Sequence, residues 1–439
     1  MNIVQITPGA GGMYCGNCFR DNALVAAFRR LGHSTLMVPL YLPMTLEEDN
    51  QSAGTPVFFS GVNVYLEQKS AFFRHMPRWL HQLLATPRIL KWAAGKAAKT
   101  RAADVGDLTL SMLRGEEGNQ ARELDELITW LRDRERPDVV CLSNALLIGL
   151  VRRLKSELNV PVICMLQGED TFLDALPVEH RDACWRTLSE RAREVDQFVA
   201  PSHYFAETMA SRLNLPAGSV HVAYNGINLD GYTVADQSPQ PPVLGYFARM
   251  CGEKGLDTLV EAYLHLRKRN RIPNLKLKIG GGCGPSDKPF VEQLRNRLRE
   301  HHVLGDVEFH PNLTREQKLA FFRTLTVFSV PALYGEAFGL YVIEALAAGV
   351  PVVKPRHAAF PELIRATGGG VICEPGDPSS LADAIEDLLL HPDKARALGE
   401  AGRKAVLRDF NIDRLARDMI QLFHETTAQM PRQSVPSSA

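Results

Sequence analysis

The sequence predicts an α/β protein with two doubly wound domains, each built on a parallel sheet. Three observations predict this fold. The chain has 439 residues, which is too long for one ordinary domain core. Short apolar runs typical of buried strands alternate with helical patterns in both halves of the chain. A polar, proline-rich stretch at residues 235–242 separates the halves and predicts a linker.

The first half of the chain opens with an apolar run at residues 2–6, a glycine-rich loop and a helical pattern over about 20–31. Gly32 follows where a helix C-cap glycine is expected, and HSTLMVPL reads as the next strand. Later strand-like runs are PDVVCLS, VPVICML and DQFVAPS. We therefore assign residues 1–234 to a first Rossmann-like domain.

The second half repeats this alternation after the linker. VLGYFAR, LKLKIGGG, VEFH, TVFSVP and PVVKP read as strands, with helical patterns between them. Residues 243–410 form the predicted second domain. A helix at 411–428 is expected to pack back toward the first domain, and residues 429–439 form a disordered tail. In such folds ligands bind at the carboxyl ends of the strands.

Composition excludes several classes of protein. Lys plus Arg and Asp plus Glu number 50 each, whereas nucleic-acid binders are more often clearly basic. No apolar run reaches the roughly 18 residues that a membrane span needs, and the N-terminus does not read as a signal peptide. Eight scattered cysteines fit buried thiols better than a disulfide framework. We expect a cytoplasmic protein.

A basic segment interrupts the first half. Residues 69–101 contain eight Lys or Arg and no Asp or Glu, with Phe72, Phe73, Trp79 and Trp92 interleaved. One interpretation is a helical cap with a solvated face. The other is an insertion that contacts an anionic or lipid-linked acceptor, or the inner membrane surface as a peripheral contact.

The strongest functional motif is PALYGEAFGLYVIEALAAG, in which Glu336 and Glu344 are eight residues apart. The backbone amides of Phe338, Gly339 and Leu340 fall at or near a helix start, where free N–H groups and the helix dipole favour an anion. Glu344 can then accept from ribose hydroxyls and Glu336 from those of a donor sugar. The alternative is an ordinary helix with a charged start.

A second motif lies at the start of the same half, in the run ARMCGEKGLDTLVEA. The strand VLGYFAR ends at Arg249, and Lys254 is expected to open the following helix. Two cations at a strand-to-helix junction can neutralise a diphosphate leaving group. The alternative is a pair of surface charges.

Taken together, these motifs resemble those of glycosyltransferase family four. RMCGEKGLDTL, IGGGCG, PALYGEAFGLYVIEALAAG and the later PEL are similar to that family's nucleotide-sugar half, and GG followed by a helix and LGH is similar to its first-domain loop. The resemblance implies a GT-B architecture, in which two Rossmann-like domains face each other across a deep cleft. It also implies retention of anomeric configuration and no required metal or other cofactor.

The resemblance also implies roles for single residues. Arg249 and Lys254 would hold the diphosphate, and with Glu336 they form the predicted catalytic set. The predicted donor-binding residues are Gly11, Gly12, Phe338, Gly339, Leu340 and Glu344. We expect transfer of a hexosyl group from a nucleotide diphosphate sugar to an unknown acceptor. The motifs identify neither the donor base nor the sugar.

The chain departs from the family pattern after the strand PVICML. Gln167 stands where members often have a histidine, and Gln cannot take up a proton near neutral pH. Glu169 and Asp170 follow at once and can replace that polar function. With Asn17 and Asp21, these three form the predicted acceptor or cleft residues. The departure leaves open a protein that binds nucleotide sugars without transferring them.

Cys15 and Cys18 form a second departure, with C-x-x-C spacing at the start of a helix. Because a helix N-terminus lowers a thiol's pKa, a redox or metal-binding pair is conceivable. No second Cys/His cluster is evident in the sequence to complete a zinc site. We favour packing or an acceptor contact for this pair, and predict no metal site.

Overall fold

A computed structural model describes residues 1–9, 16–42, 46, 48–59 and 102–430 of the chain, with residues 102–104 described by backbone alone. The described residues form two compact units. The first comprises residues 1–200, 206–223 and 416–439, and the second comprises residues 201–205 and 224–415. Each unit is described by itself.

The first unit is built on a six-stranded sheet whose paired strands are all parallel, in the order β2-β1-β3-β4-β5-β6. Its strands are β1 (Asn2–Thr7), β2 (Ser34–Pro39), β3 (Val139–Leu142), β4 (Val162–Met165), β5 (Gln197–Ala200) and β6 (Val220–Val222). Strands β3 and β4 are buried at every position, as expected for a sheet covered on both faces.

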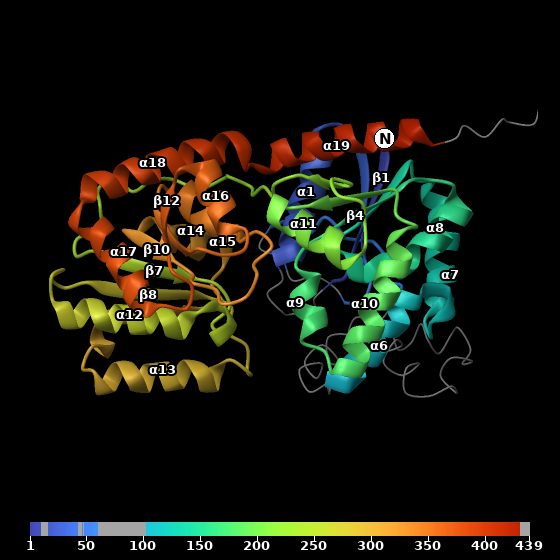
Figure 1. Cartoon of the computed structure of the whole chain (residues 1–439). Helices are drawn as coiled ribbons and strands as arrows, with labels where there is room; N and C mark the ends of the chain where they lie inside the picture. The colour runs from blue at the N-terminus through green and yellow to red at the C-terminus, as the bar shows by residue number, and fades with distance from the viewer. Residues whose placement is uncertain (10–15, 43–45, 47, 60–101, 431–439) are drawn as a thin grey trace, which may run out of the picture. The chain divides into compact units, whose positions relative to one another are not determined.

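Helices flank this sheet (Figure 1). They are α1 (Gly16–Arg30), α6 (Ala102–Arg114), α7 (Ala121–Trp130), α8 (Val151–Leu158), α9 (Glu169–Asp174), α10 (Val178–Ala192), α11 (His203–Arg212) and α19 (Ile412–Gln429). Helix α1 includes Gly16 and so extends before the predicted start near residue 20. Its first turn consists of small and polar residues without apolar periodicity, which is the signal on which the prediction relied. Phe423 of α19 packs on Phe28 of α1, with ring centroids 5.8 Å apart.

The second unit repeats the design with a six-stranded parallel sheet in the order β12-β11-β10-β7-β8-β9. Its strands are β7 (Val243–Phe247), β8 (Lys276–Gly281), β9 (Val307–Pro311), β10 (Val327–Ser329), β11 (Val352–Pro355) and β12 (Gly370–Cys373). Its helices are α12 (Leu256–Arg269), α13 (Lys288–Glu300), α14 (Arg315–Arg323), α15 (Leu340–Ala347), α16 (Phe360–Thr367), α17 (Pro378–Leu390) and α18 (Pro392–Asp409).

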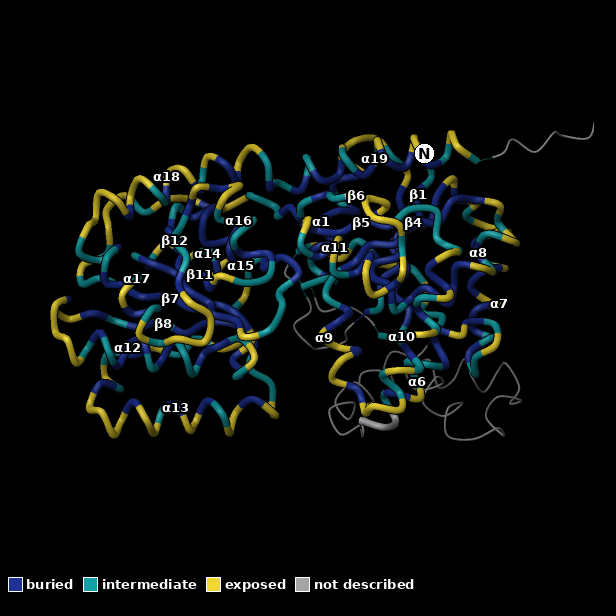
Figure 2. The backbone as a smooth tube through the Cα atoms, in the orientation of Figure 1, coloured by how far each residue is buried: buried dark blue, intermediate teal, exposed yellow. Residues whose placement is uncertain are grey.

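Burial follows the layers of each unit. In Figure 2 inner strands such as β4, β7 and β11 are dark blue, while α13 and α18 carry yellow, exposed positions along one side. The predicted pair of doubly wound parallel sheets is therefore confirmed. Among the described residues, no helix combines the length and the apolar character that a membrane span requires.

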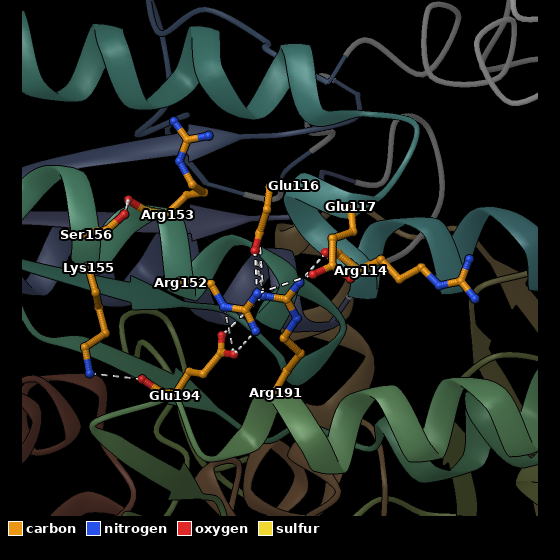
Figure 3. A network of polar contacts seen from close by, with 9 residues as sticks. All are labelled: Arg114, Glu116, Glu117, Arg152, Arg153, Lys155, Ser156, Arg191 and Glu194. Carbon is orange, nitrogen blue, oxygen red and sulfur yellow. Dashed lines mark hydrogen bonds and ion pairs between the residues drawn. The ribbon is translucent and has the colours of Figure 1, made fainter.

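An ion-pair network ties together the helices on one side of the first unit. Arg191 of α10 is almost fully buried, and it donates to Glu116 Oε1 at 3.2 Å and to the carbonyl oxygen of Arg114. Arg152 of α8 contacts Glu116 at 2.8 Å and Glu194 at 2.6 Å. Figure 3 shows the two guanidinium groups between these carboxylates. The network joins residues far apart in the sequence and satisfies a buried guanidinium.

We predict that Arg191→Met destabilises the protein by about 2 kcal/mol, since the carbonyl oxygen of Arg114 loses its buried donor and Glu116 keeps only Arg152 as a partner. Arg132→Met is the matched control, because Arg132 is half exposed and pairs with Asp133 and Glu157 at the surface. Its cost should stay below about 1 kcal/mol. Guanidinium unfolding followed by circular dichroism measures both, and equal midpoints would contradict the assigned role of the network.

Candidate functional site

The predicted catalytic residues lie after the carboxyl ends of β7 and β10, which are neighbours in the second sheet. Arg249 and Lys254 lie in the loop after β7, and Glu336 lies in the loop after β10. Because neighbouring parallel strands end at the same edge of a sheet, the two loops meet there, where ligands bind in such folds.

Lys254 and Glu336 form a direct ion pair, with Nζ 2.6 Å from Oε2. Both side chains are largely buried, at 19% and 16% exposure, which reduces screening by solvent. Two tyrosines complete the contact, since the hydroxyls of Tyr334 and Tyr341 donate to the same Oε2 at 3.1 and 2.8 Å. Lys254 Nζ also lies 4.7 Å from the Tyr334 ring centroid, in cation–π range.

The charge of Glu336 is set by these neighbours. Burial alone raises the pKa of a carboxylate, but the charges of Lys254 and Lys354 and the bonds from Lys254 and Tyr341 outweigh it. The pKa of Glu336 is therefore lowered, and its side chain is ionised at neutral pH. It remains able to accept hydrogen bonds from a ligand.

Lys254 lies in a 3-10 turn, Gly252–Lys254, and α12 begins only at Leu256, so Lys254 does not itself open the helix as predicted. Gly255 separates the two elements with φ +71°. A Cβ atom there would overlap the carbonyl oxygen of Pro331, at the end of β10. The backbone of the Lys254 loop therefore lies directly against the backbone that leads to Glu336.

Helix α15 begins at Leu340, immediately after Gly339 with φ +93°. No side chain of the described residues caps its N-terminus, so the amides of the first turn and the helix dipole are available to an anion. Phe338 is buried, and its ring packs on those of Tyr224 and Phe410. The structure thus brings the amide-bearing segment 338–340 next to the Lys254–Glu336 pair.

Glu344 lies inside α15 and is almost buried. Its Oε1 accepts from Lys318 Nζ at 2.9 Å and from the Tyr232 hydroxyl at 3.2 Å. Lys318 is itself only 4% exposed, so the pair forms part of the interior of the unit. A role for Glu344 toward ribose stays a prediction, and the geometry leaves that role to Oε2.

Arg249 is more exposed, at 57%, and is held by Asp287. Its Nε and Nη2 donate to Asp287 Oδ1 at 3.1 and 2.8 Å, whereas Nη1 has no hydrogen-bond partner among the described residues. Asp287 also accepts from the amide of Gly284 at 2.9 Å, which ties the loop after β8 to Arg249. The guanidinium is thus oriented but still has a donor group to offer.

Tyr246 is buried beside the backbone of Arg249. Burial raises the pKa of its hydroxyl well above the ordinary value, and the carboxylates of Glu336 and Asp287 add to the effect. Both pairs therefore lie within electrostatic reach of one residue. The hydroxyl donates to the carbonyl oxygen of Arg249 at 2.8 Å.

The acceptor candidates belong to the first unit. Glu169 is buried, with Oε1 accepting from the amide of Ala145 and Oε2 from that of Gln167, each at 2.8 Å. Burial raises the pKa of Glu169 and also that of Asp170, whose Oδ1 is buried with no hydrogen-bond partner in the described part of the chain. Glu169 thus holds the backbone around Gln167.

The remaining candidates lie at or near the start of α1. Asn17 is half-buried in the first turn, whereas Asp21 is fully buried and paired with Arg20. Gly11, Gly12 and Cys15 lie outside the described residues, as does the whole basic segment at 69–101. Cys18 is buried, and the six other described cysteines are free thiols. No group of metal-binding side chains occurs in the part of the chain that the structure describes.

The sequence reasoning missed the residues that support the predicted ones. They are Asp287 beside Arg249, Lys318 and Tyr232 beside Glu344, and Tyr334, Tyr341 and Lys354 around Glu336. The two tyrosines stand inside the Glu336 motif and offered a signal. Asp287, Lys318 and Lys354 come from a loop, helix α14 and strand β11, and no spacing rule links them to the motif.

Two family models match the chain. Residues 107–230 match the model described as Glycosyltransferase Family 4, and residues 235–405 match the one described as Glycosyl transferases group 1. The second match includes Arg249, Lys254, Glu336 and Glu344, while the first includes Gln167, Glu169 and Asp170.

The chain is also similar in sequence to known glycosyltransferases. The chain is 32% identical to a GDP-mannose-dependent alpha-(1-6)-phosphatidylinositol monomannoside mannosyltransferase of Mycolicibacterium smegmatis, over 59% of this chain and 68% of that protein. It is 28% identical to D-inositol 3-phosphate glycosyltransferase of Xylanimonas cellulosilytica, over 54% of this chain and 58% of that protein. The chain thus spans little more than half the length of the latter relative.

Among solved structures, the fold is similar to that of the Anabaena protein HepE, crystallised with UDP and glucose. The TM-score is 0.68 at 15% identity, covering 97% of this chain and 99% of that one. At this identity the likeness shows the fold alone.

We predict that Lys254→Met destabilises the protein by about 3 kcal/mol at pH 7, because it leaves the Glu336 carboxylate buried without its nearest counter-charge. The wild-type pKa of Glu336 lies below its unfolded value, so the stability from ionising Glu336 is present above about pH 4.5 and is lost as the pH falls through the lowered value. The penalty of the variant should therefore shrink toward pH 4.

Urea unfolding at pH 7 and pH 4 measures this difference. Lys394→Met is the control, since Lys394 is half exposed and pairs with Asp387 at the surface of the same unit. Its effect should stay below about 1 kcal/mol at both pH values. A Lys254→Met penalty that does not depend on pH would refute the proposed dependence on Glu336.

Proposed function

The chain belongs to glycosyltransferase family 4, and on that premise we propose that it moves a hexosyl group from a nucleotide diphosphate sugar to an acceptor. We further propose that transfer proceeds with retention of anomeric configuration and without a metal ion. The observation that carries the proposal is the buried Lys254–Glu336 pair beside the uncapped start of α15. It sets an ionised carboxylate, which can accept hydrogen bonds from sugar hydroxyls, next to a helix terminus that favours an anion.

The diphosphate would be met by three kinds of donor. Arg249 offers the unpartnered Nη1 of a guanidinium that Asp287 already orients. Lys254 has three N–H groups and gives one of them to Glu336, so the others can reach a phosphate oxygen. The amides at Gly339 and Leu340 add the partial positive charge of the helix start. Gly11 and Gly12 are proposed to approach the donor from the first domain.

These donors would also promote the reaction. As the bond between the sugar and the diphosphate breaks, negative charge grows on the leaving phosphate oxygen. Fixed cations and amides stabilise that charge without reorganising, which is the largest contribution in many enzymes. Arg249 and Lys254 would thereby supply the neutralisation that Mg²⁺ supplies elsewhere.

The sugar itself would be held by Glu336. Its lowered pKa keeps the carboxylate ionised, and an ionised carboxylate accepts strong hydrogen bonds from hydroxyl groups. Glu344 would contact the ribose through Oε2. Both glutamates are already oriented by lysine and tyrosine partners, so binding a donor requires little reorganisation.

The acceptor is proposed to bind the first unit near Gln167, Glu169, Asp170, Asn17 and Asp21. Two relatives act on inositol-containing, phosphorylated acceptors according to their names, which supports an anionic or lipid-linked acceptor here. The basic residues of segment 69–101 provide the matching charge, and they are also the basis for a peripheral membrane contact. A redox function of Cys15 and Cys18 gains no support from buried Cys18.

We predict that Arg249→Ala weakens nucleotide binding roughly 10- to 100-fold, the loss expected for a charge-assisted hydrogen bond. Arg271→Ala is a closely matched control, since Arg271 is 60% exposed and also pairs with a buried carboxylate, that of Glu386. The nucleotide affinity of Arg271→Ala should equal that of the wild type.

A thermal-shift titration with UDP, GDP, ADP and their glucose or mannose conjugates, with and without EDTA, provides the measurement. We expect stabilisation by one nucleotide series that EDTA does not alter. Release of the nucleotide diphosphate from that donor, with or without an acceptor, then distinguishes a transferase from a protein that only binds. Equal affinity of the two arginine variants would refute the assigned donor site.

A further inference from the structure

Lys354 is a fully buried lysine that the proposed reaction does not use. It lies in β11, the strand next to β10, and its side chain is among the largest fully buried ones of the described chain. Burying an ammonium group is costly unless it is paired, and a leucine or methionine would fill the same space without that cost. The retained charge therefore calls for a specific partner.

The partners of Lys354 point toward the Glu336 site. Its ammonium donates to the carbonyl oxygen of Val330, at the end of β10. The same nitrogen lies 4.6 Å from the ring centroid of Tyr341 and 3.9 Å from that of Phe360, both in cation–π range. The ammonium thus contacts two aromatic rings and the strand that leads to the Glu336 loop.

Tyr341 transmits this contact to the site. Its hydroxyl donates to Glu336 Oε2 at 2.8 Å, while its ring is a partner of Lys354. The orientation of the Tyr341 hydroxyl depends on the position of its ring. Lys354 therefore has a structural path to Glu336 through one intervening side chain, in addition to its charge, which helps keep Glu336 ionised.

We propose that Lys354 is a positioning residue for the donor sugar: its ammonium holds the Tyr341 ring, and the Tyr341 hydroxyl then orients the Glu336 carboxylate toward the sugar hydroxyls. This inference rests on the proposed function. It assigns to Lys354 no contact with substrate. It predicts a selective effect on the sugar moiety, because the diphosphate is met by Arg249, Lys254 and the α15 amides.

The charged and titratable groups around Lys354 act on its pKa in opposite directions. Glu336 and Cys373 favour the ammonium form, while burial and the charge of Lys254 disfavour it. Burial is the largest influence and lowers the pKa of Lys354 well below its ordinary value. His357, whose pKa is lowered by burial and by Lys354, completes the set.

The test separates the sugar from the nucleotide. Isothermal titration measures the dissociation constants of UDP and UDP-glucose, and of GDP and GDP-mannose, for the wild type and each variant. Within each pair, the dissociation constant of the nucleotide divided by that of its sugar conjugate reports how much the sugar adds to binding. The variants are Lys354→Met, which removes the ammonium, and Tyr341→Phe, which keeps the ring and removes the donor.

We expect both variants to lower that ratio by about tenfold, the loss of one hydrogen bond to a charged group, while the nucleotide alone binds as in the wild type. Because both changes interrupt the same path, the double variant should lose no more than either single variant. The control is Lys278→Met, a largely buried strand lysine of the same unit that contacts Thr324 and Glu308. Its ratio should be unchanged.

A merely structural role predicts a different result. Lys354→Met would then lower the melting temperature but leave the ratio intact in the folded protein, and that outcome overturns the inference. Tyr341→Phe tests the same path if Lys354→Met does not fold, and an unchanged ratio there also overturns it. Absence of any nucleotide binding by the wild type would instead overturn the proposed function itself, and the inference with it.

Discussion

The contact between Lys254 and Glu336 is the constraint on which the proposed ligand-binding edge of the second unit depends. A carboxylate with 16% exposure needs a counter-charge close by, and Lys254 supplies it from the neighbouring loop. The contact is possible because β7 and β10 are adjacent in the sheet, although the two residues are 82 positions apart in the chain. Once the loops are joined, the start of α15 has a fixed place beside them.

The cations of this unit differ in burial in a way that matches the functions proposed for them. Lys354 is fully buried and Lys318 is 4% exposed, and each contacts protein groups that in turn support a glutamate or its neighbour. The side chain of Lys254 is 19% exposed and lies in burial between these two lysines and Arg249, whose side chain is 57% exposed. Burial thus separates the charges that organise the site from those that can meet a diphosphate.

The sequence predicted the two parallel sheets well, because their strands are short apolar runs at positions buried on both faces. It also predicted that Lys254 and Glu336 belong to one site. Asp287, Lys318 and Lys354 escaped prediction, since each comes from a separate element of the unit and only the folded sheet brings it near the site. The roles of Gln167, Asn17 and Asp21 remain predictions, because what they contact depends on a ligand.

Gly255 has an evolutionary consequence. Its α-carbon faces the carbonyl oxygen of Pro331 so closely that no side chain fits, and its backbone is left-handed as well. The loops bearing Lys254 and Glu336 are therefore pressed together at a point that tolerates no added atom. A substitution at this junction would have to displace both loops at once, so a change of ligand preference is expected to arise at residues elsewhere.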